Sequence, residues 1–430
     1  MNEIEGKDDL NTGPLSLDAW LFMISISSYM LVRTVYSTFF GLGVLTILCM
    51  AYLTLDVISR LWTRRSALFV LLKLMVIVIG ACFLMLVPAA EQMACRQVQG
   101  RQLCAQDGLI QTEEAVRMLL QGRNPYTEDY FGTPLETAPF PIYPSPALYH
   151  LAYLPFTFLV HVPFAYPIWR SGGWYDGRVV YIVCLLLGLP IVASMAVRAT
   201  RRLALVTALG LNLPLLTFTA DGRNDILGLF CVLVSVFLAS RGHRSLSMVM
   251  MALGCASKQT VWFALPFYVL YLLRGDISVR SVGRLARQVW PFLLTLAVVV
   301  GPFLLWDFRS FVDDTVLYLT GQLPTSYPLW GMGFGTLLRM LGLVISETSY
   351  VPFWIPQLIL GLPVLGLLMV YQTRHNGLRA FWFGYAALQM VLGYFSRIFQ
   401  DNYLIIIFTA FSFAFLSEDA PVASVAEAVQ

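Results

Sequence analysis

The sequence has 430 residues, of which 58% are hydrophobic, 14% are aromatic and only 12% are charged. In a soluble domain about 25% of the residues are charged, so this composition excludes an ordinary water-soluble protein. No nucleic-acid partner is expected of such a chain, and its net charge of +3 says little. In a membrane protein the charges are sorted by side of the membrane, and their sum carries little information.

Long apolar runs recur along the whole chain. Runs of roughly 17 to 25 residues can span the hydrocarbon core of a bilayer as helices, and shorter runs can do so when neighbouring helices surround them. The pattern predicts an all-α fold, a polytopic transmembrane helical bundle of about 11 to 13 membrane segments. The apolar runs occupy residues 36–58, 66–88, 179–197, 203–218, 226–240, 288–305, 355–371 and 403–416.

The two ends of the chain are polar. Residues 1–16 lack the basic region and the small-residue cleavage site of a signal peptide, so we expect a polar cytoplasmic N-terminus. The polytopic membrane domain is expected to cover residues 17–417. An acidic, disordered tail is expected over residues 418–430.

Basic residues gather in five clusters between the apolar runs. Short loops rich in Lys and Arg stay on the cytoplasmic side, so the segments between them, including the large loop 89–145, are expected to be extracytoplasmic. Most carboxylates close to the membrane fall in this outer set. The basic clusters are Arg60, Arg64 and Arg65; Arg198, Arg201 and Arg202; Arg241 and Arg244; Arg274, Arg280, Arg284 and Arg287; and Arg374 and Arg379. The outer acids are Asp107, Asp221, Asp225, Asp307, Asp313, Asp314 and Asp401.

The segment 144–168 does not fit this alternation of sides. It is long enough to cross a membrane, but a crossing there would place the basic cluster at 198–202 on the outer side. Its five prolines would also interrupt a continuous helix. We expect a re-entrant or interfacial segment. The alternative is a kinked full span, with the basic cluster assigned to the wrong side.

Asp107 opens a stretch that has the pattern of an amphipathic helix, and Gly122 is a natural stop for it. We expect a juxtamembrane helix that lies in the membrane interface. A carboxylate at its start is placed where a base could reach both a lipid-borne donor and a water-side acceptor. The alternative is a helix cap or a solvated loop acid. The apolar face comprises Ile110, Ala115, Leu119 and Leu120, and the polar face comprises Glu113, Glu114, Arg117 and Gln121.

Cysteine spacing gives little evidence of a redox or metal site. Five of the seven cysteines lie in apolar segments, where we expect them to be buried. Cys95 and Cys104 lie in the outer loop, whose compartment permits a disulfide, and the sequence leaves open whether it forms. No cysteine spacing resembles a zinc or iron–sulfur site.

Several motifs, taken in order, resemble the GT-C glycosyltransferases. Asp107 is followed by LLQGRNPY at 119–126 and IYPSPALYHLAYLP at 142–155. These resemble the outer loop of the bacterial polyprenol-phosphate-dependent mannosyltransferase and arabinofuranosyltransferase-like branch, where an Asp and an amphipathic helix precede Gly-x-x-Pro-Tyr and Tyr-Pro-x-Pro. The string at 221–259, from DGRND to ASKQ, is similar to that branch's polar Asn motif, small-residue helix and lysine. The resemblance covers residues 66–275 and extends loosely to 416.

This resemblance implies a reaction on the extracytoplasmic face of a cell membrane. A sugar, mannose or another hexose or pentose, would move from a polyprenyl phosphate to a hydroxyl of a glycan, lipid or protein acceptor. Such a reaction needs a general base for the hydroxyl proton and cations for the leaving phosphate. By position, Asp107 matches the family's base. The expected phosphate contacts are Lys258, Arg223 and Arg397, although Lys258 could instead reach toward lipid head groups in general.

Further polar and aromatic residues are expected to contact the substrate. A divalent cation would accept carboxylates such as Asp221 and Asp225, but two acids are a weak signal. We therefore expect no obligatory metal or other cofactor, and the 221–225 turn could equally be a charged cap between spans. His150 is a candidate reserve acid–base group. The expected substrate-binding residues are Asn124, Tyr126, Tyr143, His150, Asp221, Asn224, Asp225, Asp401 and Tyr403.

Aromatic residues in loop 306–333, including Tyr318, Tyr327 and Trp330, permit two interpretations. Aromatic rings mixed with carboxylates suit sugar binding, but an aromatic belt at the membrane interface has the same composition, and we favour the belt.

Two other functional classes stay open. A lipid-linked glycan flippase or secondary transporter would also be polytopic, but would usually show internal repeats with polar groups near the midplane. A glycan ligase or polymerase would share the lipid donor and the side of action, but would typically depend on Arg and His in a large outer loop. The sequence favours the glycosyltransferase, because its key polar groups gather at one face and begin with Asp107.

Overall fold

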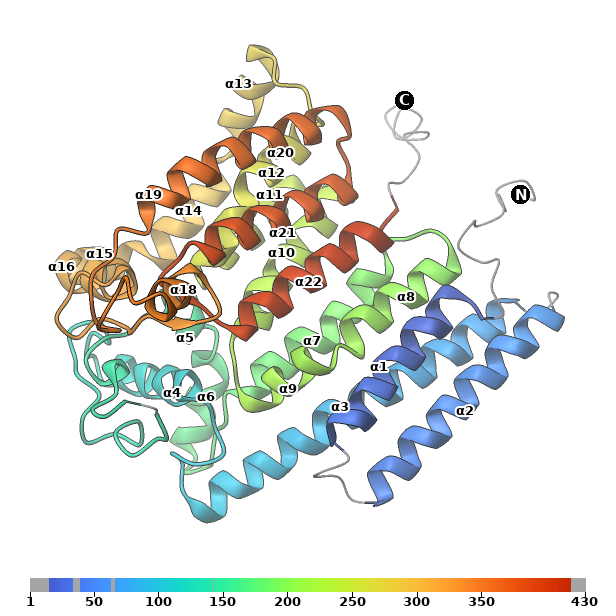
Figure 1. The fold of residues 1–430 in the computed structure, drawn as a ribbon, viewed down its shortest axis with the longest axis horizontal. Helices are drawn as coiled ribbons and strands as arrows, with labels where there is room; N and C mark the ends of the chain where they lie inside the picture. Colours follow the sequence, from blue (N-terminus) through green and yellow to red (C-terminus); the bar gives the residue numbers. More distant parts are fainter. Residues whose placement is uncertain (1–14, 34–38, 63–65, 141, 419–430) are drawn as a thin grey trace.

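The computed structural model describes residues 15–33, 39–62, 66–140 and 142–418. This part of the chain is mostly helical and has almost no strand, which confirms the predicted all-α class. Its only sheet joins two short strands in parallel, β1 (Trp330–Gly331) and β2 (Ile398–Phe399). Figure 1 shows that most of the longer helices are inclined in one common direction.

Five helices in the described ranges are long and apolar enough to cross a membrane: Gly41–Leu61, Ala67–Gln99, Ala199–Asp221, Val279–Val299 and Trp354–Arg374. Shorter apolar helices accompany them at Arg178–Ala193, Asp225–Ser240, Arg244–Cys255, Gln259–Leu272 and Asp401–Leu416. The predicted number of about 11 to 13 membrane segments stays a prediction.

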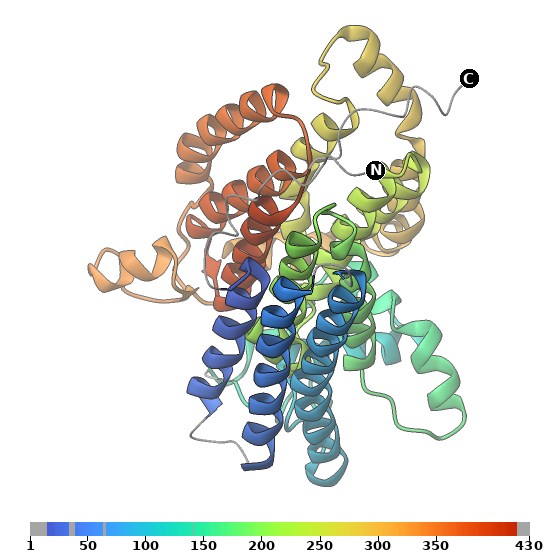
Figure 2. The same cartoon turned by 90° about the vertical axis from the view of Figure 1, so that its right-hand side faces the viewer.

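The first three helices form a layer of their own at one side of the molecule (Figure 2). They are α1 (Leu17–Arg33), α2 (Phe39–Leu61) and α3 (Ser66–Gln99). Buried Lys73 of α3 joins all three, because its ammonium lies 2.8 Å from Asp18 of α1 and 2.5 Å from Asp56 of α2. Ser16 also donates to Asp56 at 2.5 Å, so the end of the expected polar N-terminus belongs to the bundle. Residues 1–14 lie outside the described part.

The centre of the molecule consists of helices that pack through Leu, Val and Ala side chains. Asn212 follows α8 and caps α9, since its side chain accepts a hydrogen bond from the N–H of Leu215. The central helices are α7 (Arg178–Ala193), α8 (Ala199–Gly210), α9 (Leu213–Asp221), α10 (Asp225–Ser240), α11 (Arg244–Cys255), the 3₁₀ helix η4 (Gln259–Ala264) and α12 (Leu265–Leu272).

The C-terminal half adds a second group of helices and the loops that cover one end. The helices of the group are α13 (Val279–Gln288), α14 (Trp290–Val299), α20 (Leu362–Arg374), α21 (Leu378–Tyr394) and α22 (Asp401–Leu416). Short helical turns between them are α15 (Gly301–Trp306), α16 (Phe308–Val312), η5 (Asp313–Leu317), α17 (Tyr318–Thr320), α18 (Phe334–Met340), α19 (Trp354–Pro356) and η6 (Gln357–Gly361).

The proline-rich segment 144–168 contains no continuous helix. It is divided among η3 (Pro146–Leu148), α5 (Pro155–Leu159) and the first part of α6 (Val162–Arg170). The longest of these, α6, has nine residues and is therefore roughly 13 Å long, well short of a hydrocarbon core of about 30 Å. Prolines occupy the first turn of each helix, as expected of helix starts.

The last described residue of the chain makes three hydrogen bonds. Glu418, the first residue of the expected disordered tail, donates its backbone N–H to Met195 O at 2.8 Å. Its carboxylate accepts hydrogen bonds from the backbone N–H groups of Val197 and Arg198 at 2.7 and 2.8 Å. The interpretation is therefore wrong for Glu418, because two N–H groups just before α8 hold it. Residues 419–430 lie outside the described part.

Helix α4 (Asp107–Leu120) begins at Asp107 and ends shortly before Gly122, as expected, but part of its polar face is buried. Glu113 is only 5% exposed, and both of its oxygens accept from the guanidinium of Arg96, at 3.1 and 2.8 Å. Arg96 also binds Asp176 at 2.6 Å, and Asp176 binds Arg178 at 2.8 Å. We name these four buried residues the charge quartet. Much of α4 is therefore packed against protein, and its place at the membrane interface stays a prediction.

A disulfide between Cys95 and Cys104 closes the segment between α3 and α4, with their Cα atoms 6.1 Å apart. This settles the question that the sequence left open. Arg178 of the charge quartet donates to the carbonyl oxygen of Cys104, so the closed segment is held from both sides. Of the free cysteines, Cys184, Cys231 and Cys255 are buried as expected, whereas Cys49 and Cys82 are only partly buried.

We predict that Arg96→Met strongly destabilises the protein, because it leaves the buried carboxylates of Glu113 and Asp176 without this cation. Breaking a buried ion pair by removing one partner costs about 3–5 kcal/mol. Thermal unfolding of the detergent-solubilised protein measures the loss. The matched control is Arg123→Met, whose exposed pair with Glu128 should contribute at most about 1 kcal/mol. Equal melting temperatures for Arg96→Met and the wild type would contradict this role.

Candidate active site

The start of α4 is fixed against two other parts of the chain. The backbone N–H of Gln106 donates to Asp221 O at 3.1 Å, which joins this point to the end of α9. A Cβ atom at Gly108 would overlap the hydroxyl oxygen of Tyr153, so only glycine permits this close approach. Asp107, between Gln106 and Gly108, therefore has a defined place relative to both segments.

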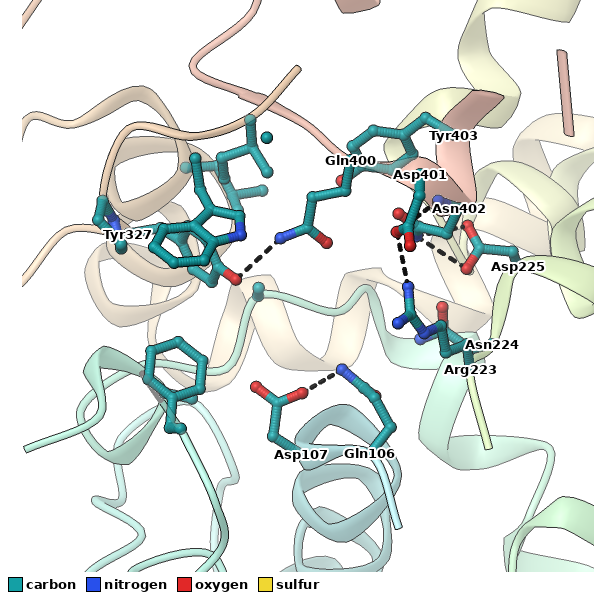
Figure 3. A pocket seen from close by; sticks show the side chains of 18 of the residues that line it. Gln106, Asp107, Arg223, Asn224, Asp225, Tyr327, Gln400, Asp401, Asn402 and Tyr403 are labelled. Carbon is teal, nitrogen blue, oxygen red and sulfur yellow. Dashed lines mark hydrogen bonds and ion pairs between the residues drawn. The ribbon is translucent and has the colours of Figure 1, made fainter. Parts of the chain in front are cut away.

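Asp107 lies at a cavity of ≈ 850 Å³. The cavity forms where the start of α4 meets the end of α9, the starts of α10 and α22, and the residues before η4. Eight of the predicted site residues line it: Asp107, Asp221, Arg223, Asn224, Asp225, Lys258, Asp401 and Tyr403. Figure 3 shows Asp107 and Gln106 on one side of this space, with Arg223, Asn224, Asp225, Asp401 and Asn402 across from them.

The carboxylate of Asp107 is surrounded by protein atoms on nearly every side but keeps some exposure to the cavity. Burial raises the pKa of this carboxyl above that of an ordinary aspartate, and the nearby Asp221 adds to the rise. The N–H of Gly108 and the charge of Arg223 act in the opposite direction. A carboxylate with a raised pKa is a stronger base than a solvated one, which suits proton abstraction from a hydroxyl.

Lys258 lies in a cluster with three residues from the ends of two helices. Its ammonium is 2.5 Å from Asp225 Oδ1 and 3.1 Å from Asn224 Oδ1. Asn402 of α22 donates to both oxygens of Asp225, at 3.1 and 2.9 Å. Asp225 thus ties η4, α10 and α22 together under the cavity. The charge of Lys258 is balanced here, so an anionic ligand would have to join this cluster.

Arg223 is the cation with the most unused hydrogen-bonding capacity among the described residues of the cavity. Its Nη1 donates to Asp401 at 2.9 Å, and its Nε lies 3.6 Å from Asp221. The guanidinium also stacks over the ring of Phe218, 3.8 Å from the centroid. Within the described ranges it makes no other side-chain hydrogen bond. A guanidinium has five N–H donors, which leaves donors available for a phosphate or a sugar.

Aromatic rings line the remainder of the cavity. Tyr327 accepts a hydrogen bond from the side chain of Gln400 at 3.1 Å, and burial raises its pKa to about 12. The phenol therefore stays neutral and can donate a hydrogen bond. Tyr318, Tyr327 and Trp330, for which the sequence favours an interfacial belt, all line the cavity. The lining aromatics are Phe140, Tyr153, Tyr318, Tyr327, Trp330 and Tyr403.

Arg397 does not contact the cavity. Its guanidinium donates to three backbone carbonyls, those of Tyr327 at 2.5 Å, Ser349 at 2.8 Å and Glu347 at 3.0 Å. It is 3% exposed, and burial lowers its pKa to about 10. In this structure Arg397 therefore holds together the loops around the cavity, and the phosphate contact stays a prediction.

Three of the expected substrate-binding residues lie away from the cavity lining. Asn124 is buried in a turn, where its side chain accepts from the N–H of Tyr126. Tyr126 is packed among aromatic rings and donates to Tyr153 O at 2.8 Å. Tyr143 is 79% exposed. Tyr126 thus contacts Tyr153 from outside the cavity, and none of the three residues lines the cavity, so their substrate contacts stay predictions.

His150 is engaged at both ring nitrogens and lines no part of the cavity. Nδ1 lies 2.7 Å from Asp314, and Nε2 lies 2.6 Å from the hydroxyl of Thr325. Asp314 also accepts the N–H of Leu151, and burial raises its pKa to about 6. The histidine thus joins the proline-rich segment to η5 and to the loop after α17. Its role as a reserve acid–base group stays a prediction.

Other lining residues are not apparent from the sequence: Gln106, Tyr153, Gln259 and Arg339. Gln259 donates to the carbonyls of Ala152 and Thr315, and Arg339 pairs with Glu347 at 3.1 Å. Neutral glutamines carry no charge signal. Arg339 lies far from the other motifs along the chain, so only the fold brings it to the cavity.

No three side chains of His, Cys, Asp or Glu come together to hold a metal ion within residues 15–33, 39–62, 66–140 and 142–418. The cavity instead combines four carboxylates (Asp107, Asp221, Asp225 and Asp401) with paired cations and neutral phenols. This set of groups can accept a proton, bind an anion and donate hydrogen bonds to hydroxyls.

Comparison of the chain with protein-family models and with curated proteins finds no match.

Proposed function

We propose that this chain is a polytopic membrane glycosyltransferase of the GT-C type. It transfers a sugar, mannose or another hexose or pentose, from a polyprenyl phosphate to an acceptor hydroxyl on a glycan, lipid or protein. The observation that carries the proposal is the place of Asp107, a buried carboxylate at the edge of a cavity that also contains Arg223, Lys258 and several aromatic rings.

The direction of the helices supports an active site on the extracytoplasmic face. Helix α10 runs from Asp225 at the cavity to Arg241, and α11 runs back from Arg244 toward Lys258. In Figure 1, α13 and the end of α22 lie at the opposite end of the molecule from α4 and α18. The basic turns and the cavity are therefore at opposite ends of the helices. If the basic turns are cytoplasmic, the cavity faces the other side.

The proposed reaction is a displacement at the anomeric carbon of the donor sugar. Asp107 takes the proton of the acceptor hydroxyl as its oxygen forms a bond to the anomeric carbon. The bond between that carbon and the phosphate oxygen breaks, and the electron pair leaves with the polyprenyl phosphate. The developing negative charge lies toward Arg223 and Lys258, which act by electrostatic stabilisation. No oxidant, reductant or further reactant is needed.

The arrangement supports this reaction better than transport. A transporter needs its polar groups near the midplane of the membrane, between repeated halves. Here the charged side chains gather where α4, α9, α10 and α22 meet, at the ends of these helices. A ligase or polymerase of lipid-linked glycans shares the donor chemistry. It would be expected to use His and Arg in the site; Arg223 and Arg339 line the cavity, but no histidine does so among the described residues.

Asp107→Asn should reduce glycosyl transfer by about 100-fold or more, because general acid–base groups contribute roughly 10² to 10⁴ in rate. The assay uses purified protein in liposomes, with a radiolabelled polyprenyl-phosphate sugar and a lipid extract as the acceptor source. Asp129→Asn, in an exposed part of the same outer loop, is the matched control and should keep wild-type activity. Full activity of a folded Asp107→Asn protein would reject the base.

The pH dependence of transfer should show an acid limb governed by Asp107. A base works only when ionised, and burial raises the pKa of Asp107. Activity should therefore be lost as the pH falls through this raised pKa, at a higher pH than for an ordinary aspartate of pKa about 3.9. Rates measured with saturating donor from about pH 4 to about pH 9 would reveal the limb. An acid limb that persists unchanged in the residual activity of Asp107→Asn would assign it to another group.

Arg223→Ala should weaken donor binding by about tenfold or more, because hydrogen bonds to charged groups contribute about 1.5–3 kcal/mol. The measurement is the KM for the polyprenyl-phosphate sugar. Arg309→Ala is the matched control, since its side chain is 92% exposed. A donor KM that rises equally in both variants, or in neither, would argue against phosphate binding by Arg223.

A further inference from the structure

The side chain and the backbone N–H of Gln106 make three hydrogen bonds at the point where α4 begins. Its side-chain Oε1 accepts the N–H of Gly108 at 2.8 Å, which caps the helix. Its side-chain Nε2 donates to Oδ1 of Asp107, and its backbone N–H donates to Asp221 O. Ser, Thr, Asp and Asn are the usual capping residues, and none of them has an N–H donor that can reach beyond the cap in this way.

The contacts of Asp107 are all on one of its two oxygens. Oδ1 accepts from Nε2 of Gln106 and from the N–H of Gly108 at 2.9 Å. Oδ2 has no hydrogen-bond partner in the described part of the chain. The carboxylate is therefore anchored through one oxygen, and the other is left for a ligand in the cavity. Figure 3 shows Gln106 beside Asp107, with the contact between the two side chains drawn.

We propose that Gln106 is a positioning residue for Asp107, which orients the carboxylate through Oδ1 and stabilises its ionised form. This inference rests on the proposed function, because it gives Gln106 a role in the reaction of Asp107. The amide suits this role because it is neutral and therefore adds a hydrogen-bond donor without adding a charge. Its carbonyl oxygen is also fixed by the start of the helix.

The other groups around Asp107 do not replace this contact. Asp221 is a like charge, and Arg223 is already paired with Asp221 and Asp401. The charge of Asp107 contributes to the raised pKa values of Tyr153, Tyr318 and Tyr327, but none of these phenols makes a hydrogen bond to it. Gln106 is thus the only side chain among the described residues that donates a hydrogen bond to Asp107. A donor to the charged form lowers the pKa of a carboxyl, while a neighbouring negative charge raises it.

The decisive variant is Gln106→Glu. It keeps an oxygen to cap α4 but replaces the amide donor with a second negative charge beside Asp107. The acid limb of the transfer rate should move upward by about one pH unit or more, with activity recovering at alkaline pH. The matched control is Gln121→Glu, which makes the same change at the exposed far end of α4, about 20 Å away along the helix. A wild-type acid limb in Gln106→Glu, or an equal movement in both variants, would overturn the inference.

Gln106→Ser provides a second variant in case the first one folds poorly. Serine is a good helix cap, but its short side chain cannot also donate to Asp107. We expect a lower kcat with an unchanged donor KM and a smaller upward movement of the acid limb. A purely structural role would instead reduce the yield of folded protein and leave the acid limb where it is, which would contradict the positioning role.

A thermal unfolding cycle separates this inference from the proposed function, because it needs no activity. Gln106→Glu should lower the melting temperature under mildly alkaline conditions, where both carboxylates are ionised, and the loss should be smaller in an Asp107→Asn background. If the two losses are equal, Gln106 and Asp107 are not coupled and the inference fails. If they differ while the wild type transfers no sugar to any acceptor, the contact stands and the glycosyltransferase proposal fails.

Discussion

The charge quartet is the constraint on which the cavity end of the molecule depends. Arg96 at the end of α3 and Arg178 at the start of α7 enclose Asp176 between them, and Arg96 also holds Glu113 of α4. Two positive and two negative groups, all nearly inaccessible to water, can remain charged only if each faces its partners. The geometry of α3, α4 and α7 is therefore not free to vary independently. The disulfide between Cys95 and Cys104 closes the connection between two of these helices and adds to the same constraint.

This constraint determines the position of Asp107. Because Glu113 is fixed to Arg96 and Gly177, the helix axis of α4 is fixed, and Asp107 lies at its first turn. The contact between Gln106 and Asp221 then sets the same turn against α9, whose end leads directly into the segment of Arg223 and Asp225. Groups that are far apart in the sequence thus meet around one cavity. The buried charges make this part of the structure rigid. The side chains available for chemistry are those whose hydrogen-bonding groups are only partly paired.

The fold class, the bounds of α4 and eight cavity residues could be predicted from the sequence, because composition, helical periodicity and isolated charges within apolar runs are local signals. Prediction failed where a side chain's contacts come from residues that are distant in the sequence. Glu113 has the pattern of a solvated residue, but Arg96 lies beside it, and Arg397 has the pattern of a phosphate ligand, but three carbonyls surround it. Tyr318 and Tyr327 have the composition of an interfacial belt, and only the fold turns them toward the cavity. Gln106 carries no charge, so nothing in the sequence marked it as a residue of the cavity.

The balance of charge in the cavity also affects when Asp107 becomes a stronger base in the proposed reaction. Lys258 is neutralised by Asp225, and Arg223 faces Asp221 and Asp401, so the resting cavity offers little free positive charge. An incoming phosphate would draw on these cations, and its negative charge would weaken the favourable effect of Arg223 on Asp107. The pKa of Asp107 would then rise further, because a nearby anion disfavours a second ionised group. Donor binding would thereby make Asp107 a stronger base at the moment when an acceptor hydroxyl has to be deprotonated. In this arrangement, the cations that bind the donor also tune the base.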